Sequence, residues 1–178
     1  MPSRTPLLDD RALGRTLVRM ATEIVERAGG TDALVLVGIQ RRGVELADRL
    51  KRLIDQAEGS TVPSGKLDIT LYRDDLQTVG ARPVVGETRL PNLDGRTVVI
   101  VDDVLYTGRT VGAALRALTD FGRMRSIQLA VFVDRGHREL PVEANFTGRK
   151  ITTRNSEVVE VRMSEIDGED AIYVMEKA

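Results

Sequence analysis

The feature that most limits the fold is an apolar run that ends in two adjacent carboxylates and a threonine- and glycine-rich turn. Residues 98–110 read Val-Val-Ile-Val-Asp-Asp-Val-Leu-Tyr-Thr-Gly-Arg-Thr. The four β-branched residues at 98–101 are typical of a buried parallel strand. Apolar residues with helical spacing follow between Val111 and Leu118. The segment therefore predicts a strand, a turn and a helix, in the order found in α/β sheets.

The carboxylates and the turn are expected to form one binding site. Asp102 and Asp103 directly follow the apolar run, at the carboxyl end of the predicted strand, where open α/β sheets bind ligands. Residues 107–110 lead into a helix N-terminus, whose backbone N–H groups bind anions. A phosphate held there would leave both carboxylates within reach of vicinal ribose hydroxyls, which donate hydrogen bonds to carboxylates. The pattern predicts a site for a phosphorylated sugar.

Other phosphate-binding patterns fit this segment less well. The chain has no Gly-x-x-x-x-Gly-Lys-Ser/Thr, and no Gly-x-Gly-x-x-Gly follows this strand. Residues 98–110 resemble the signature of type I phosphoribosyltransferases, which bind phosphoribosyl pyrophosphate. The alternatives are a solvated turn or a phosphate-receiving signalling domain. A signalling domain needs a lysine on a neighbouring strand end, whereas the loop after Val133 begins with Asp134-Arg135 and has no lysine.

The composition is consistent with a small enzyme. With 178 residues, 42% of them hydrophobic and 30% charged, the chain can bury one substantial core, which predicts a single domain over residues 1–178. The absence of cysteine excludes disulfides and thiolate metal sites. No apolar run reaches the length of a signal peptide or a membrane span, so we expect a cytoplasmic protein with no membrane partner. The net charge of −1 means that RNA binding would need a local basic face.

Strands and helices are expected to alternate along most of the chain. Asp9 or Asp10 is expected to cap a first helix that ends at Gly29-Gly30, and a second helix has its apolar stripe between Val44 and Ile54. The expected strands are residues 33–37, 67–71, 98–101 and 127–133. This alternation predicts an α/β fold with a parallel sheet flanked by helices.

The C-terminal third has a different pattern. Short apolar runs at 158–161 and 172–174 flank the turn-like Asp167-Gly168 and predict two further strands. We expect the strands of about residues 149–178 to form a small hood-like subdomain over the sheet edge.

Residues 73–91 form the one long segment with a weak pattern, and unstructured loops of that length are uncommon unless they are functional. In phosphoribosyltransferases a flexible loop at this place closes over the reaction and excludes water. The resemblance therefore implies a flexible loop that begins near Arg73. The alternative is an ordinary connection between strands.

Two more loops follow expected strands and should face the same crevice. Gly38-Ile39-Gln40-Arg41-Arg42-Gly43 follows the first strand and looks like the pyrophosphate loop of the family, with Gln40, Arg41 and Arg42 as its binding residues; an ordinary surface loop is the alternative. Asp134, Arg135 and His137 follow the strand 127–133 and are candidates for binding the base.

Three motifs together are similar to one branch of this family, the bacterial PyrR proteins, which are pyrimidine-operon attenuation regulators with uracil phosphoribosyltransferase activity. They are residues 68–76, residues 101–110 and residues 133–141, and the resemblance extends from the first helix through residue 170. It implies a type I phosphoribosyltransferase fold and the reaction of uracil with phosphoribosyl pyrophosphate to give UMP and pyrophosphate. It also implies Mg²⁺ held mainly by substrate oxygens, with no direct protein ligand set, and a homo-oligomer of two or more chains.

The resemblance also implies roles for individual residues. The catalytic residues would be Asp102, Asp103 and Arg73. The residues that bind phosphoribosyl pyrophosphate would be Asp102, Asp103, Tyr106, Thr107, Gly108, Arg109 and Thr110. Purine-using relatives often carry a third acid three residues after the acidic pair, and Tyr106 occupies that position here. The general base is therefore not identified: uracil N1 either loses its proton to another group or binds as the anion.

The branch binds a stem-loop of the pyrimidine-operon mRNA leader with UMP as co-regulator. Arg19, Arg138 and Arg149 carry positive charge at matching positions and are the candidate RNA-binding residues. At three other positions Val18, Thr22 and Glu143 replace the typical Thr, His and Arg, and the acid at 143 would repel phosphate. The alternative function is a nucleotide-sensing RNA-binding regulator with vestigial catalysis, although the intact acidic pair argues against it.

Overall fold

The protein is built around a five-stranded parallel sheet in the order β2-β1-β3-β4-β5. The computed structural model describes residues 5–75 and 85–178. The strands are β1 (Leu34–Ile39), β2 (Ser64–Leu67), β3 (Thr97–Leu105), β4 (Ser126–Asp134) and β5 (Phe146–Lys150). The predicted α/β class with a central parallel sheet is confirmed. Of the predicted flexible loop at 73–91, residues 76–84 lie outside the described part of the chain.

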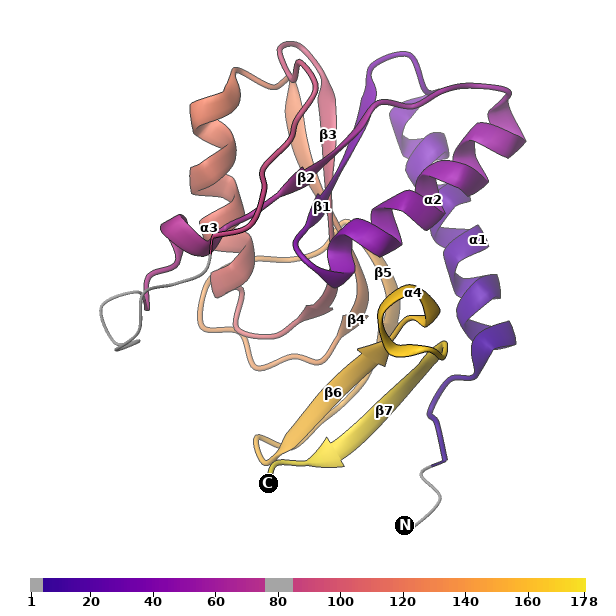
Figure 1. Ribbon diagram of the computed structural model, residues 1–178, viewed down its shortest axis with the longest axis vertical. Helices are drawn as coiled ribbons and strands as arrows, with labels where there is room; N and C mark the ends of the chain where they lie inside the picture. Colours follow the sequence, from indigo (N-terminus) through magenta and orange to yellow (C-terminus); the bar gives the residue numbers. More distant parts are fainter. Residues whose placement is uncertain (1–4, 76–84) are drawn as a thin grey trace.

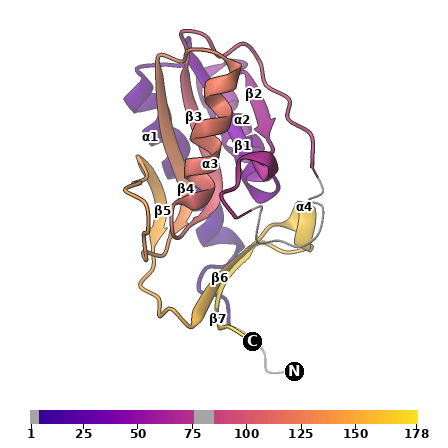
Figure 2. The same ribbon diagram turned by 90° about the vertical axis from the view of Figure 1, so that its left-hand side faces the viewer.

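Helices cover both faces of the sheet (Figures 1 and 2). α1 (Asp10–Ala28) and α2 (Arg42–Glu58) pack against one face, and α3 (Arg109–Leu118) packs against the other. Figure 2, viewed from the side that α3 covers, shows this helix in front of the sheet. Two 3₁₀ turns, η1 (Thr70–Tyr72) and η2 (Thr119–Phe121), lie beside α3. The sheet thus separates two apolar cores, as its uniformly buried strand β1 requires.

The first helix begins and ends where the sequence indicates. The Asp9 side chain accepts a hydrogen bond from the Ala12 N–H at 2.9 Å, and Gly29 adopts the left-handed conformation at the C-cap. The apolar residues at helical spacing between these caps, from Leu13 to Ile24, are buried against α2 and the sheet.

Strand β3 is longer than predicted, and its pairing explains why. Its pairing with β1 ends at Gly38 opposite Val101, which is the predicted strand end. On its other side β3 continues along β4 until Leu105 pairs with Asp134. Asp102 and Asp103 therefore lie inside β3 but beyond its last pairing with β1. This is the point at which the strand order reverses, and open sheets bind ligands there.

Two expectations about strands were wrong. The strand predicted at 67–71 ends at Leu67, because the Asp68 carboxylate accepts the Thr70 N–H at 2.8 Å and turns the chain into η1. Strand β5 was not predicted because only two of its five residues are buried, as on many sheet edges. Since β5 belongs to the central sheet, the separate C-terminal strands begin after Lys150.

The predicted C-terminal strands form an antiparallel pair, β6 (Glu157–Arg162) and β7 (Ala171–Glu176). The short helix α4 (Ser164–Asp167) lies in the connection between them. Val161, Met163 and Ile172 bury their side chains in the same core as α1 and α2. Figure 1 shows the pair below the central sheet, with α4 next to the first turn of α2. The two strands pair with each other, and apolar packing attaches this C-terminal hairpin to α1, α2 and the central sheet.

Candidate active site

A crevice of about 710 Å³ lies beyond the carboxyl ends of β1, β2 and β3. The predicted site residues that line it are Gln40, Arg41, Arg42, Arg73, Asp102, Asp103, Thr107, Arg109 and Thr110. These residues come from three separate loops, so the fold brings the predicted acidic pair, turn and arginine loop to one place. Other predicted site residues, within the described part of the chain, are not on its wall: Tyr106, Gly108, Asp134, Arg135 and His137.

The acidic pair is held by backbone amides that are close in sequence. One Asp102 carboxylate oxygen accepts the Asp103 N–H at 2.9 Å, and one Asp103 oxygen accepts the Val104 N–H at 2.8 Å. The Asp102 residue is 8% exposed. Burial and the adjacent Asp103 carboxylate raise the pKa of Asp102 well above its ordinary value. The pair is therefore a rigid acceptor site at which added negative charge is disfavoured and hydroxyl donors or cations are favoured.

The turn after the acidic pair leaves a helix N-terminus open to the crevice. Gly108 is the N-cap of α3 with φ 90°, a conformation that favours glycine, and it supplies no side-chain cap. The Thr107 carbonyl accepts the N–H groups of Glu139 and Leu140 at 2.9 and 3.0 Å. The turn is thus fixed to the loop after β4. The Arg109 N–H donates to Thr107 Oγ1 at 3.3 Å, and within the described chain the next amides of the first turn of α3, those of Thr110 and Val111, are left for an anion.

The predicted pyrophosphate loop approaches the acidic pair very closely. A Cβ at Gly43 would overlap the Val101 carbonyl oxygen, so only glycine lets α2 begin against the end of β3. The Gln40 side-chain amide donates to the Glu87 carbonyl at 2.8 Å, and the Gln40–Arg41 peptide bond is cis. The Gln40 hydrogen bond thus attaches the loop after β1 to the segment that leads into β3.

Two arginines at the crevice are paired with carboxylates. Arg109 contacts Asp74 at 2.6 Å and Glu139 at 2.9 Å, and Arg73 contacts Asp75 at 2.5 Å. These side chains are about half exposed, and ion pairs at such positions contribute little to stability, about 0–1 kcal/mol. A phosphate group can therefore replace the carboxylates as the partner of either guanidinium.

Sequence reasoning assigned no role to several residues that line this crevice, among them the polar residues Asp68 and Thr70. Asp68 follows β2 directly, and its carboxylate accepts the Thr70 and Gly86 N–H groups at 2.8 and 2.6 Å. A carboxylate at the end of a parallel strand was the available signal. The incorrect extension of this strand to residue 71 hid it.

The candidate base-binding residues gather around Tyr106. The Arg135 guanidinium lies 4.0 Å from the centre of the Tyr106 ring, and the edge of His137 faces the same ring with centroids 5.9 Å apart. Arg135 is 5% exposed and donates to Thr153 Oγ1 at 3.2 Å. His137 Nε2 lies 2.7 Å from the Thr153 carbonyl, so it carries the hydrogen. The cluster is held in place because both Arg135 and His137 donate hydrogen bonds to Thr153.

Asp134 lies at the end of β4 and is tied to the same loop. Its carboxylate accepts hydrogen bonds from Arg138 at 2.6 Å and from the Gly136 N–H at 3.0 Å. Burial alone would raise the pKa of Asp134, but these two hydrogen bonds hold it below the ordinary value. Arg138 also donates to the carbonyls of Val142 and Tyr106, both at 2.8 Å. Arg138 therefore braces two loops.

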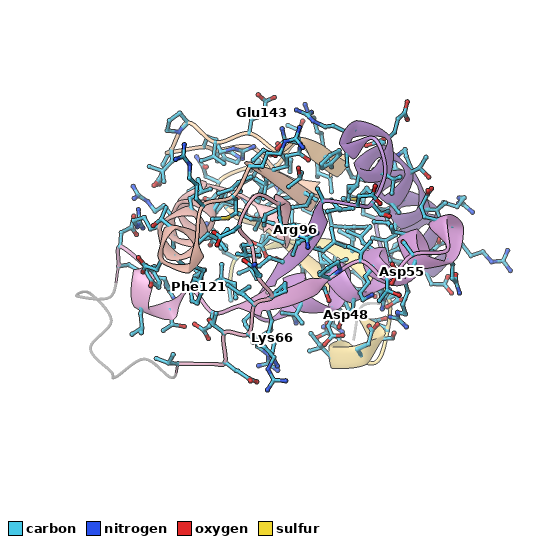
Figure 3. The ribbon with its side chains drawn as sticks, turned by 90° about the horizontal axis from the view of Figure 1, so that it is seen from above. Asp48, Asp55, Lys66, Arg96, Phe121 and Glu143 are labelled. Atoms are coloured by element: carbon cyan, nitrogen blue, oxygen red, sulfur yellow. The ribbon has the colours of Figure 1, made fainter. Side chains whose placement is uncertain are left out.

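The other candidate RNA-binding residues lie on a different part of the surface. Arg19 and Arg149 line one shallow hollow together with Arg15. Arg19 donates to the Gly148 carbonyl at 2.5 Å, which joins α1 to β5. Arg138 is not among the residues that line this hollow in the described chain. Figure 3 shows Glu143 pointing away from the body of the molecule.

The described residues contain no group of three or more His, Cys, Asp or Glu side chains placed to hold a metal ion. None of the helices in the described ranges has the length and hydropathy of a membrane span.

Comparisons with known proteins agree with this geometry. Residues 3–165 match the phosphoribosyl transferase domain family. The chain is 54% identical over 176 residues to the bifunctional protein PyrR of Pelotomaculum thermopropionicum, covering 98% of this chain and 97% of the relative. It is 51% identical over 177 residues to the bifunctional protein PyrR of Clostridioides difficile, covering 99% of this chain and 100% of the relative.

Solved structures show the same fold at low sequence identity. A hypoxanthine-guanine phosphoribosyltransferase of Bacillus anthracis superposes with a TM-score of 0.74 at 17% identity, covering 97% of this chain and 98% of that chain. The hypoxanthine phosphoribosyltransferase of Trypanosoma cruzi gives a TM-score of 0.73 at 18% identity, covering 98% and 97%. The family match over residues 3–165 and the PyrR relatives at 51 and 54% identity show that the chain belongs to the phosphoribosyltransferase family, in its PyrR branch.

Proposed function

We propose that this protein is a uracil phosphoribosyltransferase that also regulates pyrimidine operons by binding their leader RNA when UMP is bound. The observation that carries the enzymatic half is the crevice in which an acidic pair, an open helix N-terminus and an arginine loop converge. The bifunctional PyrR relatives support the combination of the two activities. The setting is the cytoplasm, where both substrates and nascent mRNA are present, and the assembly is a homo-oligomer.

The acidic pair and the α3 N-terminus would bind the two ends of the phosphoribosyl group. Asp102 and Asp103 accept the vicinal ribose hydroxyls, and their negative charge favours the positive charge that develops on the ribose ring. The turn of Thr107, Gly108 and Thr110 receives the 5′-phosphate with its backbone amides and hydroxyls. The rigidity of both elements keeps the reacting carbon of the sugar in one place.

The arginines on the opposite wall would stabilise the leaving pyrophosphate. The C1′–oxygen bond breaks, the electron pair leaves with pyrophosphate, and Arg41, Arg42 and Arg73 offset its charge. Carboxylate oxygens are ligands that Mg²⁺ accepts, and the described residues offer the adjacent Asp102 and Asp103 but no third ligand beside them. This fits a Mg²⁺ held mainly by substrate oxygens, which would supply further charge neutralisation of the pyrophosphate.

The base would bind beside the Tyr106 cluster. Uracil loses its N1 proton to solvent and binds as the anion, and its N1 electron pair forms the C1′–N1 bond as pyrophosphate leaves. Tyr106 stands where purine-using relatives often carry an acid, so no carboxylate at that position accepts this proton. Arg135 lies on the Tyr106 ring, and Lys177 Nζ lies 5.9 Å from the ring centre. These two positive charges favour the uracil anion over the neutral base.

The RNA site would lie on the surface formed by α1 and β5. Arg19 and Arg149 share one hollow with a further arginine, and this local positive charge suits a phosphate backbone. Arg138 braces the loop that carries the base candidates, and so would act on RNA through the loop's position.

The deciding experiment measures pyrophosphate release from phosphoribosyl pyrophosphate with uracil, hypoxanthine, guanine or orotate. We expect turnover with uracil and at least tenfold less with each other base. Turnover with a purine or orotate instead of uracil would refute the base assignment. UMP binding without turnover on any base would favour a nucleotide-sensing regulator with vestigial catalysis.

A further inference from the structure

The position of Arg42 is set by a residue far away in the sequence. Arg42 is the first residue of α2 and lines the crevice. Its guanidinium donates to the Asp167 carboxylate at 2.8 Å, across a separation of 125 residues. Asp167 ends α4, in the connection between the two C-terminal strands. The contact therefore joins the pyrophosphate wall of the crevice to the C-terminal hairpin.

Asp167 is itself fixed before it meets Arg42. Its second carboxylate oxygen accepts the Met163 N–H at 2.9 Å, and its side chain is only 16% exposed. Burial would raise the pKa of Asp167, but the Met163 amide and the Arg42 guanidinium together hold it below the ordinary value. The carboxylate is thus an ionised and oriented acceptor.

Within the described residues, the contact with Asp167 is the one hydrogen bond that the Arg42 side chain makes. Its Nε is buried and has no hydrogen-bond partner within the described residues. A guanidinium has five N–H donors in a rigid planar arrangement, so one strong contact sets the direction of the others. The Asp167 contact therefore decides which donors of Arg42 face the crevice.

A second ion-pair connection provides an internal comparison. Arg49, two turns further along α2, contacts Glu165 at 2.5 Å and Asp170 at 2.7 Å. Neither Arg49 nor Glu165 lines the crevice. The same short helix α4 thus has one contact with the crevice wall and another that only attaches the hairpin to α2.

We propose that Asp167 is a positioning residue for the transferase reaction: it orients Arg42 for pyrophosphate and so links the C-terminal hairpin to pyrophosphate binding. This inference rests on the proposed function, because it assumes that phosphoribosyl pyrophosphate occupies the crevice. Loss of the contact would leave the Arg42 side chain mobile and so weaken the binding of phosphoribosyl pyrophosphate, the substrate that carries the pyrophosphate group. Uracil carries no pyrophosphate, so its own binding would change little.

The test compares Asp167→Asn with Glu165→Gln in the full chain. Asp167→Asn keeps the side-chain size and the acceptor for Met163, whereas Glu165→Gln removes the same charge from the same helix away from the crevice. For Asp167→Asn we expect the KM for phosphoribosyl pyrophosphate to rise on the order of tenfold, the effect of one hydrogen bond between charged groups. The KM for uracil should change less than about twofold, and Glu165→Gln should leave both values within that range.

A second pair of variants tests whether Asp167 acts through Arg42. In an Arg42→Gln background, adding Asp167→Asn should have no further effect on this KM, because the contact is already gone. If Asp167→Asn does not fold, Asp167→Glu moves the carboxylate by one methylene, and we expect it to raise the same KM by a smaller factor. Calorimetric binding of phosphoribosyl pyrophosphate with Mg²⁺ gives the same comparison without turnover.

Three results would overturn the inference. Equal KM values for Asp167→Asn and wild type would remove the positioning role. An equal rise of the KM for phosphoribosyl pyrophosphate in Asp167→Asn and Glu165→Gln would show that Asp167 only attaches the hairpin to α2. If Asp167→Asn still raised this KM in the Arg42→Gln background, Asp167 would act by a route other than Arg42. If the wild-type protein fails to bind phosphoribosyl pyrophosphate, the proposed function is wrong, and this inference, which depends on it, is wrong as well.

Discussion

Two segments that line the crevice, the acidic pair of β3 and the arginine loop after β1, are fixed in different ways. Near the carboxyl end of β3, each carboxylate of the acidic pair is held by the N–H of the next residue, at 2.9 and 2.8 Å. After β1, Gln40 is held by the Glu87 carbonyl and Arg42 by Asp167, which are 47 and 125 residues away. The carboxylates of the acidic pair are therefore held locally, whereas the arginine loop after β1 depends on distant parts of the chain.

This difference predicts how the acidic pair and the arginine loop after β1 respond to substitutions elsewhere in the chain. The acidic pair should keep its geometry under substitutions elsewhere, so its variants should report on chemistry. The arginine loop should shift when residues of the long loop or the C-terminal hairpin are substituted, because Glu87 and Asp167 hold it. Variants of this loop should therefore change the affinity for substrate.

The largest effect is expected at the acidic pair. Asp102→Asn and Asp103→Asn should each lower the rate of UMP formation by about 10²–10³-fold, the scale of losing one electrostatic contact in the transition state. Steady-state kinetics with uracil measure this, and circular dichroism checks the fold. Asp48→Asn, an exposed change on α2, is the control and should leave the rate unchanged. Wild-type turnover in either acidic-pair variant would contradict the ribose assignment.

A smaller effect is expected at the base cluster. Arg135→Lys keeps the charge but loses the planar group that lies on the Tyr106 ring and donates to Thr153. The KM for uracil should rise by about 3–10-fold, the range of one cation–π contact in a desolvated site. The KM for phosphoribosyl pyrophosphate should stay within twofold. A change in that second KM alone would place Arg135 outside the base site.

The stability of the protein should respond to Asp102 in the direction opposite to activity. An acid whose pKa is raised in the folded state destabilises that state as pH rises, because the unfolded chain releases the proton at lower pH. Asp102→Asn should therefore unfold at a higher temperature than wild type near pH 7, with the difference vanishing below the ordinary aspartate pKa. About 1 kcal/mol would correspond to roughly 2–4 °C in a domain of this size. Thermal melts from about pH 3 to pH 8, a range that includes the ordinary aspartate pKa, test this, and a less stable variant at pH 7 would contradict it.

The smallest effect concerns RNA. Glu143→Arg should tighten binding of a pyrimidine-operon stem-loop in the presence of UMP and steepen the salt dependence by about one unit in slope. Uracil turnover should not change, because Glu143 does not line the crevice. Glu58→Arg reverses an exposed charge at the end of α2 and serves as the control. Equal RNA affinity in Glu143→Arg and wild type would place residue 143 outside the RNA face.

The contrast between local and long-range contacts also explains how much could be predicted from the sequence. The signature loop was predictable because its strand, acidic pair, turn glycine and helix are consecutive, and each supports the next. The cap at Asp9 and the C-cap at Gly29 were predictable for the same reason. The contact of Arg42 with Asp167 was not, because no local pattern relates two residues so far apart.

The errors also have physical causes. Asp68 was missed because alternating apolar residues at 67, 69 and 71 indicate a strand, whereas hydrogen bonds to its carboxylate turn the chain after Leu67. The strand end at Val101 was placed too early because β4 extends the pairing of β3 beyond β1. The first error reflects a local hydrogen bond that the alternating pattern does not reveal, and the second depends on a neighbouring strand that is distant in sequence.

The most direct test of the central claim is the affinity for UMP compared with dUMP in the wild-type protein and in Asp103→Asn. If the acidic pair accepts the ribose hydroxyls, wild type should bind UMP more tightly by roughly 10- to 100-fold, the effect of one hydrogen bond to a charged group. Asp103→Asn should lose most of that preference while still binding dUMP. Equal affinity of the wild-type protein for the two nucleotides would contradict the assignment of this crevice to a phosphoribosyl group.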